Sequence, residues 1–80
     1  MFNVLVAEDD KNIRKLMELR LSAEGYNVYS AGDGEEALKL MEGNQIDIMI
    51  VDVMMPKMDG YELVKTVRET DSQIPAIMVT

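Results

Sequence analysis

The sequence contains neither cysteine nor histidine. Without cysteine, the chain has no disulfide framework and no thiolate metal site. Without histidine, it lacks the other usual zinc ligand and the commonest general base. Any chemistry at this protein must therefore be carried by other groups, above all by carboxylates.

Long apolar runs and basic residues are also scarce. No fully apolar run exceeds the length of Ile48–Val51, which is far too short to span a membrane. The segment Met1–Val6 lacks the basic start of a signal peptide, so we expect a cytoplasmic location. Acidic residues outnumber basic ones by 15 to 8, and the resulting charge of -7 disfavours binding to nucleic acid or to an anionic membrane surface.

The composition is that of a small globular domain. Of the 80 residues, 48% are hydrophobic and 29% are charged, and only two are proline, which excludes a disordered tail or a linker. We find no internal repeat and no low-complexity stretch. We therefore expect residues 1–80 to belong to one domain, with no room for a second core.

Short apolar runs alternate with segments of helical period. The apolar runs cover residues 2–7, 26–30, 46–51 and 74–80. The order β-α-β-α-β-α-β requires parallel pairing through crossover helices, so the sequence predicts an open, doubly wound parallel sheet. Residues 26–30 alternate between apolar and polar positions more than the other runs do, which indicates an edge strand.

The predicted helices carry their own start and stop signals. In the first helix, apolar residues at Ile13, Leu16, Met17 and Leu21 form one face, and Gly25 is placed to end the helix in a left-handed conformation. The pairs Asp33/Glu36 and Asp59/Glu62 have the spacing of capping boxes and open the second and third helices. Inward-facing residues of these two helices are expected to be Ala37, Leu38, Met41, Leu63, Val64 and Val67.

Two of the predicted strands end in acids. Glu8, Asp9 and Asp10 follow the first strand, and Asp52 follows the third. If these strands are neighbours, their ends lie roughly 5 Å apart, and the carboxylates crowd one place. Like charges raise one another's pKa unless a cation lies between them, and a purely oxygen ligand set favours Mg²⁺. The alternative is that these acids only cap loops or helix N-termini.

Three segments together resemble a known family. They are "VLVAEDD", "DIMIVDVMMPKMDGYELVKTVRE" and "IPAIMVT", and the resemblance covers the whole chain. They resemble the receiver domain of two-component response regulators, the CheY-like family, and in particular regulators of the OmpR/PhoB class. The resemblance implies a flavodoxin-like fold with strand order 2-1-3-4. It also implies Mg²⁺-dependent acceptance of a phosphoryl group from a histidine kinase, as a switch for an output domain that in the parent protein binds DNA.

The resemblance assigns roles by position. Asp52 aligns with the phosphoacceptor, and Glu8 and Asp9 align with the acidic pair that holds Mg²⁺. The backbone carbonyl of Met54 would complete the metal ligands, and Thr80 aligns with the switch hydroxyl. Such a domain assists its own phosphotransfer and is not expected to be an enzyme. The eight basic residues, Arg14 and Lys15 among them, are expected mostly at solvated helix positions.

Two other functions are compatible with a carboxylate at a strand end. A hydrolase of the haloacid-dehalogenase type also uses a strand-end aspartate with Mg²⁺, but its second aspartate, the general acid, is replaced here by Met54. The other alternative is a binding module that cannot complete the phosphorylation switch. In the family, the fold continues after the fourth strand and supplies a lysine and an aromatic switch residue, so residues 1–80 would be the first part of a receiver. An exposed edge at residues 76–79 would then favour a homo-oligomer.

Overall fold

The computed structural model describes residues 2–55, 58–70 and 73–79. Strands and helices alternate along the chain, which confirms the predicted order. The elements are β1 (Asn3–Ala7), α1 (Lys11–Ala23), β2 (Asn27–Ala31), α2 (Gly34–Gly43), β3 (Ile48–Asp52), α3 (Gly60–Thr70) and β4 (Ala76–Val79). Among the described residues, no helix combines the length and apolar character needed to cross a membrane.

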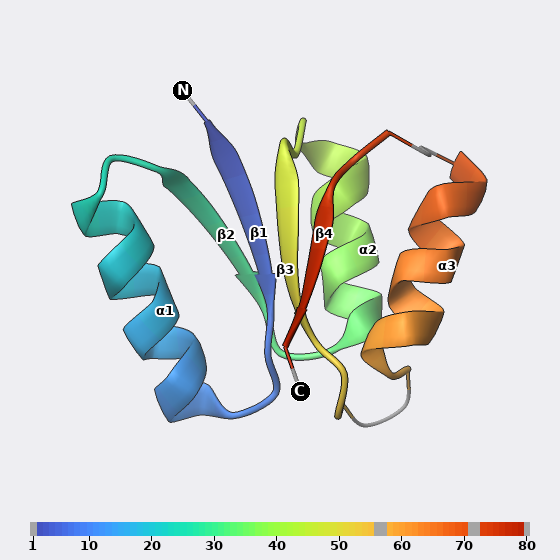
Figure 1. Cartoon of the computed structure of the whole chain (residues 1–80), viewed down its shortest axis with the longest axis horizontal. Coiled ribbons are helices and arrows are strands. Elements are labelled where there is room, and N and C mark those ends of the chain that lie inside the picture. Colours follow the sequence, from blue (N-terminus) through green and yellow to red (C-terminus); the bar gives the residue numbers. More distant parts are fainter. Residues whose placement is uncertain (1, 56–57, 71–72, 80) are drawn as a thin grey trace.

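The four strands form one parallel sheet in the order β2-β1-β3-β4 (Figure 1). This order confirms the predicted flavodoxin-like, doubly wound sheet, and β2 is an edge strand as its alternating pattern indicated. The two central strands are β1 and β3, and their register pairs Ala7 with Val51. Their carboxyl ends are therefore adjacent, at the edge of the sheet where such folds bind ligands.

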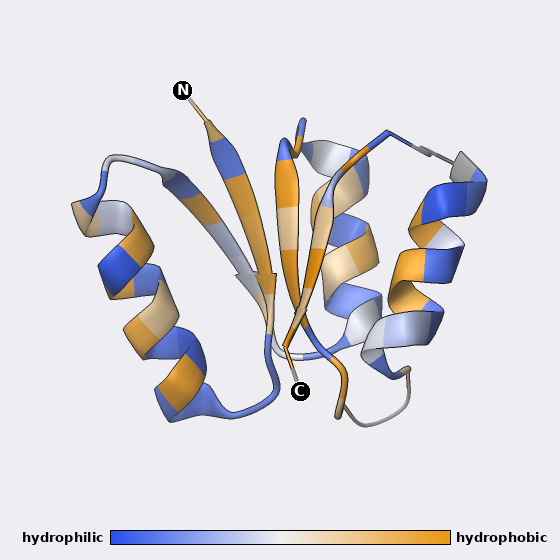
Figure 2. Cartoon of the chain, viewed as in Figure 1, coloured by the Kyte–Doolittle hydropathy of each residue, from blue (hydrophilic) through white to orange (hydrophobic). Residues whose placement is uncertain are grey.

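The main core lies between the sheet and the helices α2 and α3. Leu5, Met49 and Val51 of the central strands are fully buried there, together with Ala37 of α2 and Leu63 of α3. Figure 2 shows the central strands as largely hydrophobic, while the helices carry mixed surfaces. The inward faces predicted for the second and third helices are confirmed, because these faces supply the apolar side chains that cover the sheet.

The opposite face of the sheet is covered less completely. Helix α1 lies beside β1 and β2 on this face (Figure 1), and none of its residues, all of which the structure describes, is buried. The predicted apolar face of α1 is present, yet Ile13 is 48% and Leu16 is 59% exposed. Leu16 borders a shallow apolar hollow that reaches Ile50 of β3. Ile13 and Leu16 are exposed because no second helix among the described residues packs beside α1.

Strand β4 differs partly from its prediction. The exposed edge predicted at residues 76–79 is only partly apolar and open. Ile77 and Val79 are indeed 51% and 42% exposed, but Ala76 and Met78 pack against the main core. Alternate residues of a strand point to opposite faces of the sheet, so only one of the two faces of β4 is open. Along one edge β4 pairs with β3, and along its other edge it pairs with no strand among the described residues.

The helix ends follow the predicted signals. The Asp10 side chain caps α1 by accepting hydrogen bonds from the Asn12 and Ile13 amides. Asp33 accepts from the Glu36 amide, and Asp59 accepts from the Glu62 amide, at 2.9 Å each. The second capping-box bond differs at α2, because the Glu36 carboxylate accepts from the amide of Gly32, not from that of Asp33.

Gly25 follows α1 with a φ of 94°, as predicted for a left-handed helix end. A Cβ at this position would meet no atom within 4 Å, so only the backbone conformation opposes a side chain. Replacement of Gly25 by Ala is expected to lower the free energy of unfolding by about 1 kcal/mol in urea denaturation. Gly43→Ala is the control, because Gly43 also has open space but no positive φ. Equal destabilisation by both variants would contradict this explanation.

Candidate functional site

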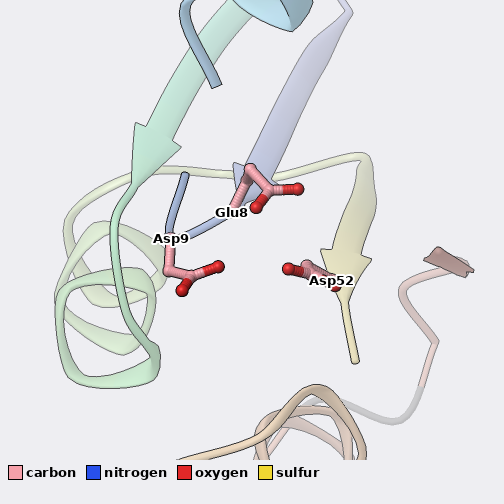
Figure 3. Close-up of side chains that lie close together, drawn as sticks. All are labelled: Glu8, Asp9 and Asp52. Atoms are coloured by element: carbon pink, nitrogen blue, oxygen red, sulfur yellow. The ribbon is translucent and has the colours of Figure 1, made fainter. Parts of the chain in front are cut away.

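Three carboxylates meet at the carboxyl ends of the central strands. Glu8 and Asp9 directly follow β1, and Asp52 is the last residue of β3. One oxygen from each carboxylate lies within 4.8 Å of the other two. Figure 3 shows the carboxyl groups of Glu8, Asp9 and Asp52 converging on one place between the two strand ends. The predicted convergence of these acids is confirmed, because β1 and β3 are neighbours in the sheet.

Glu8 is the most buried member of this group. It is 7% exposed, whereas Asp52 is half-buried and Asp9 is exposed. Burial raises the pKa of Glu8 above its usual value, against the lowering effect of the Asp10 amide. Hydrogen bonding to Asp52 and Asp9 and repulsion from Asp52 raise it further. No basic side chain among the described residues contributes to this shift. The three carboxylates therefore concentrate negative charge, and burial and mutual repulsion disfavour the ionised form of Glu8.

These residues suit a hard divalent cation. All three offer carboxylate oxygens, the ligand type that Mg²⁺ prefers, and their mutual distances allow one ion to contact more than one of them. A cation at this place would also relieve the repulsion that the buried Glu8 experiences. The donor set and the concentrated negative charge thus both fit the Mg²⁺ that the sequence predicted.

Backbone amides hold two of the carboxylates. The Asp10 amide donates to Oε2 of Glu8 at 3.0 Å, and the Met54 amide donates to Oδ1 of Asp52 at 3.1 Å. The amide of Met54 thus lies beside the site, while its side chain is 76% exposed. The role predicted for the Met54 carbonyl stays a prediction. Asp10, which follows the first strand with the other acids, instead caps α1 and is not part of the cluster.

The predicted switch hydroxyl, Thr80, lies outside the described residues. The residue before it, Val79, pairs with Asp52 across β3 and β4. The carbonyl of Val79 accepts a hydrogen bond from the Val53 amide at 3.1 Å. The end of β4 is therefore joined to the backbone that carries Asp52, and the assignment of Thr80 remains a prediction.

Glycines allow the loops around the site to approach one another. The Gly60 amide donates to the Val53 carbonyl, and a Cβ on Gly60 would lie 2.5 Å from the Asp52 carbonyl oxygen. A Cβ on Gly34, at the start of α2, would lie 2.8 Å from the Cβ of Met58. No pattern in the sequence indicated the close approach at Gly34. One signal could have indicated it: glycine is a poor helix former, yet it stands directly after the Asp33 cap, where a side chain would otherwise be favoured.

A residue of the first helix was also missed. Arg14 was expected to be solvated, but it is half-buried, and its Nη1 donates to the backbone carbonyl of Glu8 at 2.9 Å. The sequence predicted that Arg14 lies on the first helix, but no sequence pattern indicated a contact with the backbone of the acidic segment. Spacing along the chain alone does not give the direction of a long, flexible side chain.

A larger hollow lies at the other end of the molecule. It has a volume of about 610 Å³ and is lined by residues of α2 and α3 and by the segments that precede β3 and β4, such as Asp47 and Pro75. It contains none of the three clustered carboxylates. The chemistry-bearing residues are therefore at the carboxyl ends of the strands and not in this hollow.

A parallel sheet in the order β2-β1-β3-β4, with carboxylates gathered at the ends of its two central strands, defines a flavodoxin-like α/β protein with an acidic site. The family model described as "Response regulator receiver domain" matches residues 4–80. The chain belongs to this family. It is thus a receiver domain of the two-component signal transduction systems, as the sequence motifs indicated.

Similar proteins agree with this assignment. The chain is 47% identical over 78 residues to a probable transcriptional regulator ycf27 of Cyanidium caldarium, covering 98% of this chain and 31% of the relative. The chemotaxis protein CheY4 of Vibrio cholerae has a TM-score of 0.95 at 39% identity, over 98% of this chain and 67% of CheY4. The response regulator TrrA of Thermotoga maritima, solved in complex with Mg²⁺-BeF, has a TM-score of 0.92 at 36% identity, over 98% and 68% of the two chains.

TrrA has also been solved in complex with the histidine kinase ThkA, with a TM-score of 0.92 to this chain at 36% identity, over 100% of this chain and 69% of TrrA. The chain spans about a third of the length of the curated transcriptional regulators that it matches.

Proposed function

We propose that Asp52 accepts a phosphoryl group from a histidine kinase in a Mg²⁺-dependent reaction. The observation that carries this proposal is the convergence of Glu8, Asp9 and Asp52, whose oxygens lie within 4.8 Å of one another. Glu8 and Asp9 would hold the metal together with Asp52 and the backbone carbonyl of Met54, with Asp9 as a direct ligand and Glu8 acting through water. Thr80 would bind a phosphoryl oxygen after transfer.

Phosphoryl transfer depends mainly on positioning and on the neutralisation of charge. An oxygen of Asp52 forms a bond to phosphorus while the bond from phosphorus to the imidazole nitrogen of the kinase phosphohistidine breaks, and the imidazole leaves with that electron pair. The Met54 amide holds Oδ1 of Asp52, which fixes the orientation of the attacking carboxylate. A bound Mg²⁺ would offset the repulsion between this carboxylate and the incoming phosphoryl group.

The partner and the output follow from the relatives. TrrA forms a complex with a histidine kinase, which supports a kinase of this class as the phosphodonor for this chain. The ycf27 relatives are named as probable transcriptional regulators, which supports a role of the domain in transcription control within a longer protein. We further propose that the domain is a cytoplasmic phosphoacceptor that assists its own phosphorylation and is not an enzyme.

A second candidate function is a binding module that associates with another copy of the chain. The observation in its favour is that β4 is an edge strand of the described sheet, with Ile77 and Val79 51% and 42% exposed on its open face. An exposed apolar edge strand can pair with a second chain. Under this proposal, light scattering at micromolar concentration detects a dimer or a larger species, and a monodisperse monomer contradicts it.

The first proposal is tested by treating the 80-residue chain with acetyl phosphate and Mg²⁺, and separately with beryllofluoride and Mg²⁺. We expect the intact mass to increase by one phosphoryl group, and beryllofluoride to shift the amide resonances of Asp52 and its neighbours. Both effects should vanish in Asp52→Asn. Asp47→Asn is the control, because Asp47 lies before β3, at the opposite end of that strand. A folded chain that does not react at all would favour the binding module.

A further inference from the structure

Arg14 connects helix α1 to the acidic segment. Its side chain turns back from the first part of α1, and its Nη1 donates to the backbone carbonyl of Glu8 at 2.9 Å. The amide of the same residue, Glu8, donates to the carbonyl of Ala31 at the end of β2, at 3.0 Å. The backbone of Glu8 is therefore anchored on both sides, by a strand on one side and by a guanidinium group on the other.

The guanidinium group lies close to the backbone at Gly32. A Cβ on Gly32 would lie 2.9 Å from Nη1 of Arg14 and 3.6 Å from its Cζ. The Gly32 amide donates to the carboxylate of Glu36, so this part of the connection between β2 and α2 is itself fixed. Gly32 has no positive φ, so its backbone conformation does not require glycine. The absence of a side chain at Gly32 instead provides the space that Arg14 occupies.

The carbonyl of Glu8 belongs to the peptide unit that joins Glu8 to Asp9. The orientation of this peptide unit sets the direction in which the chain continues to Asp9, and hence where the Asp9 carboxylate lies. On the other side of the turn, the Asp10 amide donates to Oε2 of Glu8 at 3.0 Å. The hydrogen bond from Arg14 thus acts on the one peptide unit shared by the two acids that follow β1.

We propose that Arg14 is a positioning residue for the acidic site. By fixing the peptide between Glu8 and Asp9, with Gly32 providing the space, it holds both carboxylates in the arrangement that converges on Asp52. This inference rests on the proposed function, because it assigns to Arg14 a part in Mg²⁺ binding. Arg14 itself contacts the backbone of a ligand residue and not the ion.

The charge of Arg14 and its hydrogen bond have opposite effects on Mg²⁺ binding. A cationic side chain near an anionic site repels a metal ion, so removal of the charge alone strengthens binding. Loss of a group that orients a ligand weakens binding, typically by 10- to 100-fold for groups just outside the metal ligands, which is an approximate range. We expect the loss of orientation to dominate. The direction of the change therefore separates the positioning role from a general electrostatic one.

The test is a titration of Mg²⁺ into the 80-residue chain by calorimetry and by amide resonances. We expect Arg14→Ala to bind Mg²⁺ roughly 10-fold more weakly than the original chain, and Arg14→Lys, which keeps one donor, to be intermediate. Lys15→Ala is the matched control, because it removes the same charge from the next, exposed helix residue. It is expected to bind Mg²⁺ equally or slightly more tightly.

Gly32→Ala is expected to break the hydrogen bond from Arg14 to Glu8 while Arg14 itself is still present. Its Cβ displaces the guanidinium group, so we expect weaker Mg²⁺ binding in the single variant and no further loss when it is combined with Arg14→Ala. This variant also decides the question if Arg14→Ala does not fold. Additive losses, or Mg²⁺ binding by Arg14→Ala that equals or exceeds that of the original chain, would overturn the proposal.

A measurement without metal separates this proposal from the proposed function. Hydrogen exchange of the Asp10 amide, which is bonded to Glu8, is expected to be faster in Arg14→Ala and Gly32→Ala but not in Lys15→Ala. Unchanged exchange in the first two variants overturns the positioning role. Failure of the original chain to bind Mg²⁺ contradicts the proposed function instead, while the exchange rates still report on the turn that Arg14 holds.

Discussion

Replacement of Glu8 by Gln is expected to stabilise the metal-free chain at neutral pH and, at the same time, to weaken Mg²⁺ binding. Glu8 is 7% exposed and lies with Asp9 and Asp52 in a group whose oxygens are within 4.8 Å of one another. At an effective dielectric constant of about 20, two carboxylates about 5 Å apart repel by roughly 3 kcal/mol. Glutamine keeps an oxygen for the Asp10 amide but removes the charge, so we expect a gain of about 2 kcal/mol.

The pH dependence of stability follows from the raised pKa of Glu8, which is caused first by burial and then by Asp52 and Asp9. A carboxyl group with a raised pKa in the folded state favours folding while it is protonated. This contribution is fully present below the pKa of the unfolded chain, about 4.3, and is lost as the pH rises through the pKa of the folded state. The metal-free chain should therefore lose stability from mildly acidic to neutral pH, and Glu8→Gln should lose less.

Urea denaturation followed by circular dichroism, at several pH values and with or without Mg²⁺, measures both effects. Mg²⁺ should stabilise the original chain at neutral pH by mass action on the folded state, and should stabilise Glu8→Gln much less, since its affinity is expected to fall by about 10- to 100-fold. Glu42→Gln is the control, because it makes the same chemical change at an exposed position of α2. A metal-free Glu8→Gln variant that is less stable than the original chain would contradict the account of the site.

The fold and the main site could be predicted because they depend on local and periodic features. Four apolar runs separated by helical segments determine a parallel sheet, and acids at the ends of two strands meet if these strands are neighbours. The order β2-β1-β3-β4 makes β1 and β3 neighbours, and Glu8, Asp9 and Asp52 accordingly converge. Helix caps such as Asp33 were likewise predictable, because a cap and its helix are adjacent in sequence.

The features that were missed depend on long-range contacts. The apolar face of α1 was recognised, but the exposure of Leu16 depends on what packs beside the helix and not on its own periodicity. The hydrogen bond from Arg14 to the Glu8 carbonyl depends on a side-chain conformation. The close approach of Gly34, the first residue of α2, to Met58 joins two different βα units. Neither contact has a signature in residue spacing, since each is set by the way separate elements dock.

Replacement of Gly60 by Ala is expected to have the largest effect on stability among the glycine variants. Gly60 is the first residue of α3, and its amide donates to the Val53 carbonyl at 3.0 Å. A Cβ there would lie 2.5 Å from the Asp52 carbonyl oxygen and 2.9 Å from the Cα of Val53. Both atoms belong to the backbone, which cannot rotate away as a side chain can. We expect a loss of about 3 kcal/mol in the free energy of unfolding.

The same substitution should also alter the acidic site, because the backbone that must move carries Asp52. We expect Gly60→Ala, where it remains folded, to bind Mg²⁺ more weakly and to react more slowly with acetyl phosphate. Gly43→Ala is the matched control at the end of α2, since a Cβ on Gly43 meets no atom within 4 Å. In a helix, alanine is favoured over glycine by about 1 kcal/mol, so this control should be neutral or stabilising. If Gly60→Ala matched the control in both stability and Mg²⁺ affinity, the close approach of α3 to Asp52 would not be a determinant of the site.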